Sequence, residues 1–318
     1  HMGIGFTSST APKKVAPILD DMRQRAEQRN RDMLARINAH LDPLGLDYDR
    51  DVLPLTPAGN ATERHMLAAY LQAADAEFAD PASFWAGKLD LPLERVSSLM
   101  EQQPKFANEV RARLMKRGGV GYVQPGPDTF PAVGELHELV EACGALPCVT
   151  WLDGLSEGEQ AMEELLELMI GKGAVALNIV PDRNWNIVDP ELKRIKLQKL
   201  IEVVDLARQF DLPLNVGTEM NACGQKLVDD FDVPELAPVR DAFMAGAYFI
   251  YGHTALQRAA GMGYQSSWAQ SQFSERREYN DFYTKTGRLV QPGQTGLARL
   301  ERLSPALSAA EILDGLKG

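Results

Sequence analysis

The pattern of apolar and polar positions divides the chain into a helical first third and a longer remainder with strand character. Apolar residues recur at helical spacing in a charged background over residues 12–40, which predicts a long amphipathic helix. Further helices are predicted over residues 62–74 and, between successive prolines, up to residue 117. We therefore expect residues 1–117 to form a helical cap or insertion.

From residue 118 onward, short apolar runs alternate with amphipathic helices. The candidate strands are "GYV" at 121–123, "LPCVTW" at 146–151, "AVALNIV" at 174–180, "LPLNVG" at 212–217 and "AYFIYG" at 247–252. The clearest helix between them is predicted over residues 190–210. Such alternation is typical of a parallel sheet, either in a (β/α) barrel or in a doubly wound layer. Residues 118–318 are thus predicted to form a parallel α/β portion with a helical tail.

The composition of the chain argues against nucleic-acid and membrane partners. The formal net charge of -11 argues against a protein that binds a nucleic-acid backbone, which requires a concentrated basic face. No apolar run approaches the ~20 residues that cross a bilayer, so no membrane partner is expected. The three cysteines contain no CxxC pair, which is typical of reduced thiols in a cytoplasmic protein. A small-molecule substrate is the partner that remains.

Polar residues follow the predicted strands at the positions where parallel folds place their chemistry, namely the carboxyl ends of strands. These residues are Trp151, Asp153, Asp182, Arg183, Asn184, Glu219, Asn221, Cys223 and His253. Asp153 precedes Gly154 and also suits a structural turn. Glu219 is harder to explain as structure, because glutamate is a poor turn former and follows a buried strand. We expect these groups to converge on one rim if the strands are parallel neighbours.

Four segments occur in an order that resembles a known family. "GIGF", "GNATERHMLAAYL", "GALPCVTWLDG" and "VGTEMNA" are similar to segments of the polymerase-and-histidinol-phosphatase (PHP) family of metal-dependent phosphoesterases, over about residues 3 to 222. The resemblance implies a distorted (β/α) barrel of PHP type. In that family, histidines and acids at the strand ends hold divalent metals that activate water for phosphoester hydrolysis.

The family's ligands carry over only in part. His65 matches the histidine at the start of a helix, and Glu219 occupies the place of an aspartate ligand. Trp151 stands where the family has a histidine, and Asn221 replaces its last one. The family's opening His-x-His strand has no counterpart. Either the chain is a fragment of a longer protein, or the metal centre has been lost.

The resemblance implies a PHP-like hydrolase that acts on a small phosphorylated substrate. It points to a divalent metal, zinc, manganese or iron, at His65 and Glu219, and the position of His253 after a predicted strand adds a third candidate ligand. Glu219, Asp153 and Asn221 are the candidate catalytic residues. The residues expected to bind the substrate are Arg64, Arg183, Asn184 and Trp151, with an arginine holding phosphate through paired hydrogen bonds.

Two alternatives stay open. The barrel is a degenerate, non-catalytic one in which Trp151 and Asn221 line a pocket for an organic ligand, or it is a sugar isomerase or aldolase that uses Glu219 as a general base. In each case an incomplete barrel would expose a sheet edge, and a homo-oligomer is one way to cover such an edge.

Overall fold

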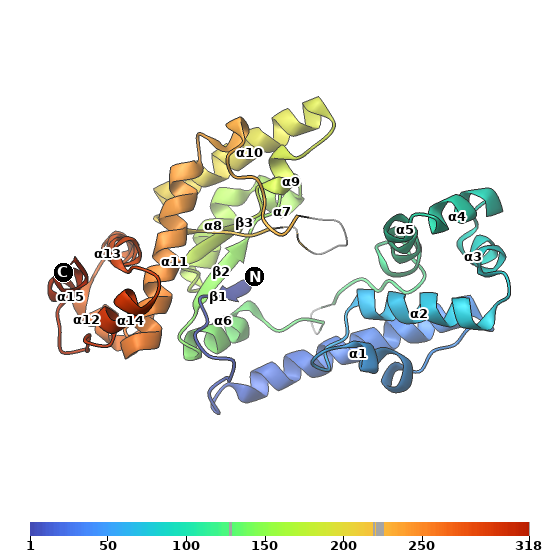
Figure 1. Cartoon of the computed structure of the whole chain (residues 1–318), viewed down its shortest axis with the longest axis horizontal. Coiled ribbons are helices and arrows are strands. Elements are labelled where there is room, and N and C mark those ends of the chain that lie inside the picture. The colour runs from blue at the N-terminus through green and yellow to red at the C-terminus, as the bar shows by residue number, and fades with distance from the viewer. Residues whose placement is uncertain (127–128, 219, 221–225, 318) are drawn as a thin grey trace. The chain divides into compact units, whose positions relative to one another are not determined.

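The computed structural model describes residues 1–126, 129–218, 220 and 226–317. They form two compact units, each with its own hydrophobic core (Figure 1). The first unit combines His1–Ala16 with the chain from Ala132 onward, and the second unit consists of Pro17–Pro131. The sequence analysis had placed a single boundary near residue 117.

The second unit is helical, as the periodicity in this part of the chain predicts. Its α-helices are α1 (Ala16–Leu41), α2 (Glu63–Glu77), α3 (Pro81–Leu89), α4 (Leu93–Met100) and α5 (Gln103–Met115), with the short turns η1 (Tyr48–Val52) and η2 (Leu53–Leu55) after α1. Proline occupies the first turn of α3 and of α5, where its missing N–H costs no helical hydrogen bond.

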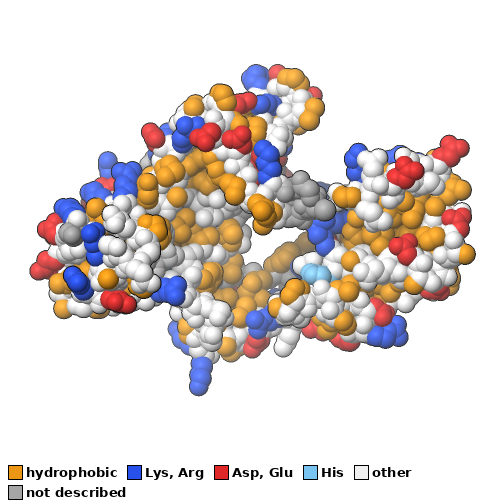
Figure 2. Space-filling model, viewed as in Figure 1, with side chains coloured by type: hydrophobic (Ala, Val, Ile, Leu, Met, Phe, Trp, Pro, Cys, Tyr) orange, Lys and Arg blue, Asp and Glu red, His pale blue; other side chains and the backbone are white. Residues whose placement is uncertain are grey.

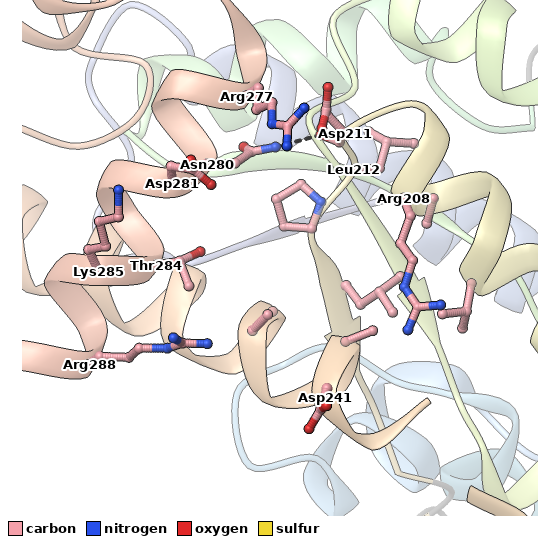
Figure 3. A pocket seen from close by; sticks show the side chains of 17 residues that line it. Arg208, Asp211, Leu212, Asp241, Arg277, Asn280, Asp281, Thr284, Lys285 and Arg288 are labelled. Atoms are coloured by element: carbon pink, nitrogen blue, oxygen red, sulfur yellow. Dashed lines mark hydrogen bonds between the residues drawn. The ribbon is translucent and has the colours of Figure 1, made fainter. Parts of the chain in front are cut away.

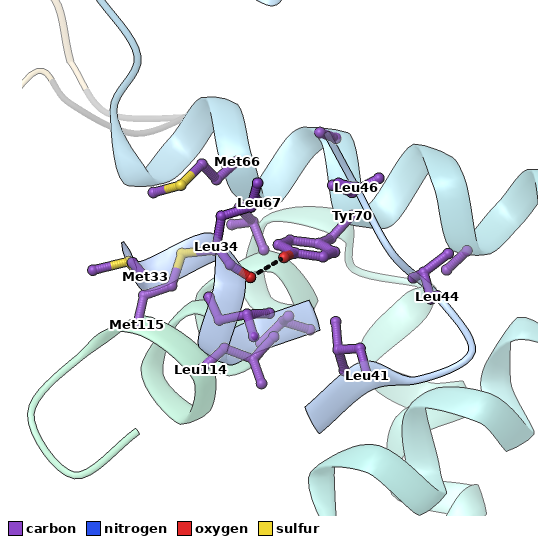
Figure 4. Close-up of a cluster of buried hydrophobic side chains, with 14 of the residues drawn as sticks. Met33, Leu34, Leu41, Leu44, Leu46, Met66, Leu67, Tyr70, Leu114 and Met115 are labelled. Carbon is purple, nitrogen blue, oxygen red and sulfur yellow. Dashed lines mark hydrogen bonds between the residues drawn. The ribbon is translucent and has the colours of Figure 1, made fainter. Parts of the chain in front are cut away.

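The core of the second unit forms where the apolar stripes of α1 and α2 meet (Figure 4). Leu34, Ile37 and Leu41 recur every three or four residues along α1 and are buried. Tyr70 of α2 is also buried, and its hydroxyl lies within hydrogen-bonding distance of two acceptors, the Leu34 carbonyl oxygen (3.2 Å) and Asn38 Oδ1 (2.7 Å). Its polar end is therefore satisfied within an apolar core.

The first unit contains one four-stranded sheet in the order β1-β2-β3-β4. The strands are β1 (Met2–Ile4), β2 (Leu146–Thr150), β3 (Ala176–Ile179) and β4 (Leu214–Val216). β1 pairs antiparallel with β2, whereas β2, β3 and β4 are parallel neighbours. Three of the predicted strands are thus confirmed, together with their parallel arrangement.

Helices cover both faces of this sheet. They are α6 (Val133–Ala142), α7 (Glu157–Gln160), α8 (Met162–Gly171), α9 (Asp182–Trp185), α10 (Pro190–Gln209), α11 (Arg240–Ala260), α12 (Ser267–Gln272), α13 (Arg276–Leu289), α14 (Gln294–Leu300) and α15 (Ala309–Lys317), with η3 (Pro234–Leu236) before α11. On one face, Val149 and Leu177 share a core with residues of α8 and α10. On the other face, Cys148 and Ala176 share a core with residues of α11 and α13.

The predicted barrel is wrong. The sheet is open and small, and helices make up most of the described chain. The run "AYFIYG" at 247–252, expected as a strand, lies inside α11, and residues 121–123 lie outside the strands. A short apolar run does not distinguish a buried helix from a strand, and the buried positions Phe249, His253 and Leu256 show the helical period instead.

Glycines allow α11 to approach its neighbours closely (Figure 1). A Cβ atom on Gly246 would lie 2.0 Å from the Leu214 carbonyl oxygen of β4. On the side of α13, a Cβ on Gly252 would lie 2.0 Å from the Tyr283 carbonyl oxygen, and one on Gly287 would lie 1.9 Å from the Tyr248 carbonyl oxygen. These contacts are between backbones, so they fix α11 against both elements.

The surface in view mixes charges of both signs. In Figure 2, Lys and Arg side chains are interspersed with Asp and Glu side chains over both units. None of the helices in the described part of the chain is long and apolar enough to cross a membrane.

Candidate functional site

The predicted site residues at the end of β2 have structural partners. Trp151 is only 1% exposed and belongs to the core between the sheet, α8 and α10. The Asp153 carboxylate accepts hydrogen bonds from Lys196 Nζ (2.9 Å) and from the Leu155 amide (3.2 Å). Glu159 accepts hydrogen bonds from the amides of Leu152 and Gly154 in the same loop. The loop after β2 is therefore held by its own carboxylates.

Asn184 joins this loop to the end of β3. Its side chain is fully buried, and Nδ2 donates to the carbonyl oxygens of Leu152 (3.2 Å) and Val180 (3.3 Å). Arg183 precedes it in the short helix α9. The structure thus brings Asp153 and Asn184 to the same edge of the sheet, as expected for parallel strands, with Asn184 acting as a bridge between two loops.

Two of the three residues expected to hold a metal, His65 and His253, belong to different units. His65 and Arg64 belong to the second unit, where His65 Nδ1 accepts a hydrogen bond from the Thr62 amide (3.0 Å) in the cap of α2. His253 belongs to the first unit and lies within α11, where its ring contacts Gly5, the residue after β1. Glu219 and Asn221 lie outside the described residues, so their predicted roles stay predictions.

His253 is enclosed by its own unit. Its Nδ1 accepts a hydrogen bond from the Tyr264 amide (3.0 Å), and the opposite edge of the ring lies against Gly5. Burial lowers the pKa of His253 to about 4, with the Gly5 backbone acting in the opposite direction. Its side chain is completely buried, so this imidazole is a neutral core group.

The prediction of a metal-binding hydrolase in a TIM-like barrel is corrected accordingly. Among the residues that the structure describes, no group of three His, Cys, Asp or Glu side chains could hold a metal ion. Both candidate histidines already have structural roles. His65 caps α2 in the second unit, and His253 is packed inside the first unit.

Sequence reasoning missed a row of polar side chains on the parallel strands. The register places Thr150 beside Asn178 and Asn178 beside Asn215, on neighbouring strands. Asn215 Nδ2 donates a hydrogen bond of 2.6 Å to Asn178 Oδ1. The signal was present in the sequence, since each of the two apolar runs "AVALNIV" and "LPLNVG" contains one asparagine, two residues before its end.

Asn178 is 5% exposed, so this amide is almost wholly removed from water. Its Oδ1 is occupied by Asn215, while its amino group has no hydrogen-bond partner within the described ranges and is not sealed from solvent. We refer to Asn178 and Asn215 as the amide pair. It offers hydrogen-bonding groups at the carboxyl ends of two parallel strands, where ligands of such sheets bind.

A cavity of about 380 Å³ lies beside the amide pair, between β4 and α11. It is lined by Leu214, Asn215, Val216, Phe243, Ala247, Ile250, Tyr251 and Thr254. Most of these side chains are apolar, and the Thr254 hydroxyl donates to the Ile250 carbonyl within its own helix. The cavity therefore combines an apolar wall with the amide of Asn215.

Among the described residues no strand pairs with the far side of β4, and this edge adds backbone groups to the cavity. Leu177 N donates to the Pro213 carbonyl, and Gly217 N donates to the Ile179 carbonyl, so these residues of the β4 segment face β3. Because peptide groups alternate along a strand, those of Val216 point to the unpaired side. This arrangement can recognise a polar ligand through hydrogen bonds. Two of the ionisable side chains expected here, Asp153 and His253, are engaged elsewhere.

Comparisons of the chain with family models, with curated proteins and with solved structures found no match.

Proposed function

We propose that the first unit binds a small uncharged ligand that carries an amide, carbonyl or hydroxyl group next to an apolar part. The observation that carries this proposal is the amide pair, in which the nearly buried Asn178 is hydrogen-bonded to Asn215 on the adjacent strand. An asparagine in the buried strand β3 is costly for the fold, because a strand with apolar faces gains more from an apolar residue.

The hydrogen-bonding capacity of the pair does not depend on how either amide is oriented. One N–H of one residue and the carbonyl oxygen of the other are used between them. One amino group and one carbonyl oxygen remain for a ligand in either assignment. The remaining amino group is not sealed from solvent, so a ligand that accepts its hydrogen bond adds the net value of one such bond, about 0.5–1.5 kcal/mol.

The cavity suits a small molecule. Its volume of about 380 Å³ lies in the lower part of the range found for small-molecule sites. The Val216 peptide group presents N–H and C=O side by side, as a strand presents them to a partner strand. An amide-containing ligand matches both the peptide edge and the Asn215 amide, while Ile250 and Phe243 accept its apolar part.

Nuclear magnetic resonance titration tests this proposal. N-acetyl-leucinamide is uncharged, carries two amides and has an apolar side chain, so it is expected to shift the side-chain amide signals of Asn178 and Asn215. Ethyl 4-methylpentanoate has a similar apolar part but no N–H donor, and we expect it to bind at least fivefold more weakly, the equivalent of about one hydrogen bond.

Variants locate the effect. Asn215→Leu keeps a similar volume at a half-exposed position, and it should weaken N-acetyl-leucinamide binding at least fivefold. Gln270→Leu, at an exposed position of α12 in the same unit, is the matched control and should bind as the parent does. Equal binding to the parent and to Asn215→Leu, or equal binding of amide and ester, would refute the proposal.

A further inference from the structure

A second cleft lies at the amino-terminal end of β4, away from the amide pair. Its volume is about 570 Å³, and it is bounded by the end of α10, the first half of α11 and one face of α13 (Figure 3). The floor of the cleft is apolar and is formed by α10, β4 and α11. Its main residues are Val204, Ala207, Leu214 and Ala245. We call this space the α13 cleft.

The α13 wall of the cleft is basic. Arg277, Thr284, Lys285 and Arg288 recur along it at helical spacing, so they share one face of the helix (Figure 3). Lys285 and Arg288 are three residues apart and are therefore neighbours on that face. Asp281 is the acidic residue that lines the cleft from this helix.

The basic groups of this wall are available for a ligand. In the part of the chain that the structure describes, Arg277, Lys285 and Arg288 form no ion pair with a carboxylate. Arg288 lies over the ring of Tyr248, 5.4 Å from its centroid, which holds the guanidinium in place without neutralising it. By contrast, Arg208 across the cleft pairs with Asp205 at 2.8 Å.

The cleft lacks the acidic excess of the whole chain. The cleft is lined by four basic residues and by three acidic ones, Asp211, Asp241 and Asp281, whereas the chain carries a formal net charge of -11. Two of the acids come from the elements opposite α13. The positive charge is thus concentrated along α13.

We infer that the α13 cleft binds a small organic anion, with a carboxylate or phosphate group held by Lys285 and Arg288 and an apolar body resting on the floor around Ala245 and Leu214. The guanidinium offers paired hydrogen bonds to either anionic group, and the ammonium adds a compact charge. The inference does not rest on the ligand proposed for the amide pair, because it uses different polar side chains, although Leu214 lines both cavities.

Two dyes that differ by one anionic group test the inference. 8-Anilinonaphthalene-1-sulfonate is an amphiphilic anion whose fluorescence rises in apolar surroundings, and N-phenyl-1-naphthylamine is its counterpart without the sulfonate. The sulfonate is expected to bind the parent protein at least tenfold more tightly than the neutral dye. Its affinity should fall as salt is added, because the basic side chains are exposed. Phenyl phosphate and phenylacetate should each displace it, and their relative potency shows which anionic group is preferred.

The double variant Lys285→Gln and Arg288→Gln should lose at least tenfold in affinity for the sulfonate and keep its affinity for the neutral dye. The matched control is Arg302→Gln, which removes an exposed cation of the same unit outside the cleft and should leave both affinities unchanged. Ala245→Trp, which fills the floor, should abolish binding of both dyes. Absence of sulfonate binding to the parent, or equal sulfonate affinity of the double variant and the parent, would overturn the inference.

Discussion

Replacing Gly252 by alanine should destabilise the first unit by about 2 kcal/mol, a large effect for one added methyl group. The new Cβ would lie 2.0 Å from the Tyr283 carbonyl oxygen and 2.8 Å from the Gly287 nitrogen. Carbon and oxygen normally approach to about 3.3–3.6 Å, so α11 and α13 would have to separate by more than ~1 Å. Both neighbours are backbone atoms, so no change of side-chain rotamer relieves the overlap.

The magnitude follows from two opposing effects. Overpacking of a core costs about 1–3 kcal/mol. We expect a cost at the upper end of this range, because separating α11 from α13 also loosens the packing of Phe249 and Tyr283. Alanine is better than glycine inside a helix by up to ~1 kcal/mol, which offsets part of the cost. For a unit of this size, the net loss corresponds to a melting temperature lower by about 4–8 °C.

Thermal unfolding followed by tryptophan fluorescence measures this change, since Trp151, Trp185 and Trp268 report on the first unit and Trp85 reports on the second. Gly315→Ala is the matched control. Gly315 lies inside α15, and its nearest neighbour would be a side-chain atom 4.0 Å away. This variant should be neutral or slightly more stable than the parent.

The double variant Gly252→Ala and Gly287→Ala tests whether the loss of stability comes from the separation of α11 and α13. A Cβ on Gly287 would meet the Tyr248 carbonyl oxygen at 1.9 Å, so both substitutions push the same two helices apart. Once the helices have separated, the second methyl group costs less, and the double variant should lose less stability than the two single variants together. A Gly252→Ala protein as stable as the parent, or strictly additive losses, would refute the close packing of these helices.

Two further predictions concern charged and titrating groups. Burial lowers the pKa of His253 to about 4, below the value of about 6.5 for a free imidazole, so its contribution to stability is complete above pH ~6.5 and is lost as the pH falls towards 4. The full contribution of His253 to the unfolding free energy is ~3 kcal/mol. His253→Leu should therefore flatten the rise of the unfolding free energy between pH 4 and pH ~6.5. An unchanged slope would contradict the lowered pKa of His253. In the second unit, burial raises the pKa of Glu63, but its pairs with Lys116 (2.9 Å) and Arg111 (2.8 Å) outweigh that effect and lower it. Glu63→Gln should therefore cost this unit about 1 kcal/mol at low salt and much less in 1 M sodium chloride, and an equal loss at both salt concentrations would argue against the ion pairs.

The sequence predicted the fold where local patterns carry the information. The parallel strands β2, β3 and β4 follow from short apolar runs, and the long helices α1 and α10 follow from apolar residues at helical spacing. These patterns do not depend on which element packs against them. Residues 247–252 were wrongly predicted as a strand, because their apolar character suits a buried helix equally well. A sheet closes into a barrel only when strands far apart in the sequence pair with each other. No local sequence pattern shows whether they do.

The candidate site was predictable only in its location. Polar residues were expected at the carboxyl ends of the strands, and Asp153 and Asn184 do lie at that edge. Their roles depend on partners such as Lys196 and the Leu152 carbonyl, which the sequence does not reveal. The amide pair depends on the register between β3 and β4, which places two asparagines 37 residues apart in direct contact.

The antiparallel pairing of β1 with β2 has a consequence for the order of events during synthesis. Met2 pairs with Cys148, and the whole second unit, Pro17–Pro131, is translated between them. The ribosome therefore releases a complete helical unit while the first strand still awaits its partner. Closing so long a loop is slow, so the helical unit should fold first and shorten the effective distance between the two strands. Exchange of backbone amide protons during refolding should show protection of α1 and α2 before that of β1.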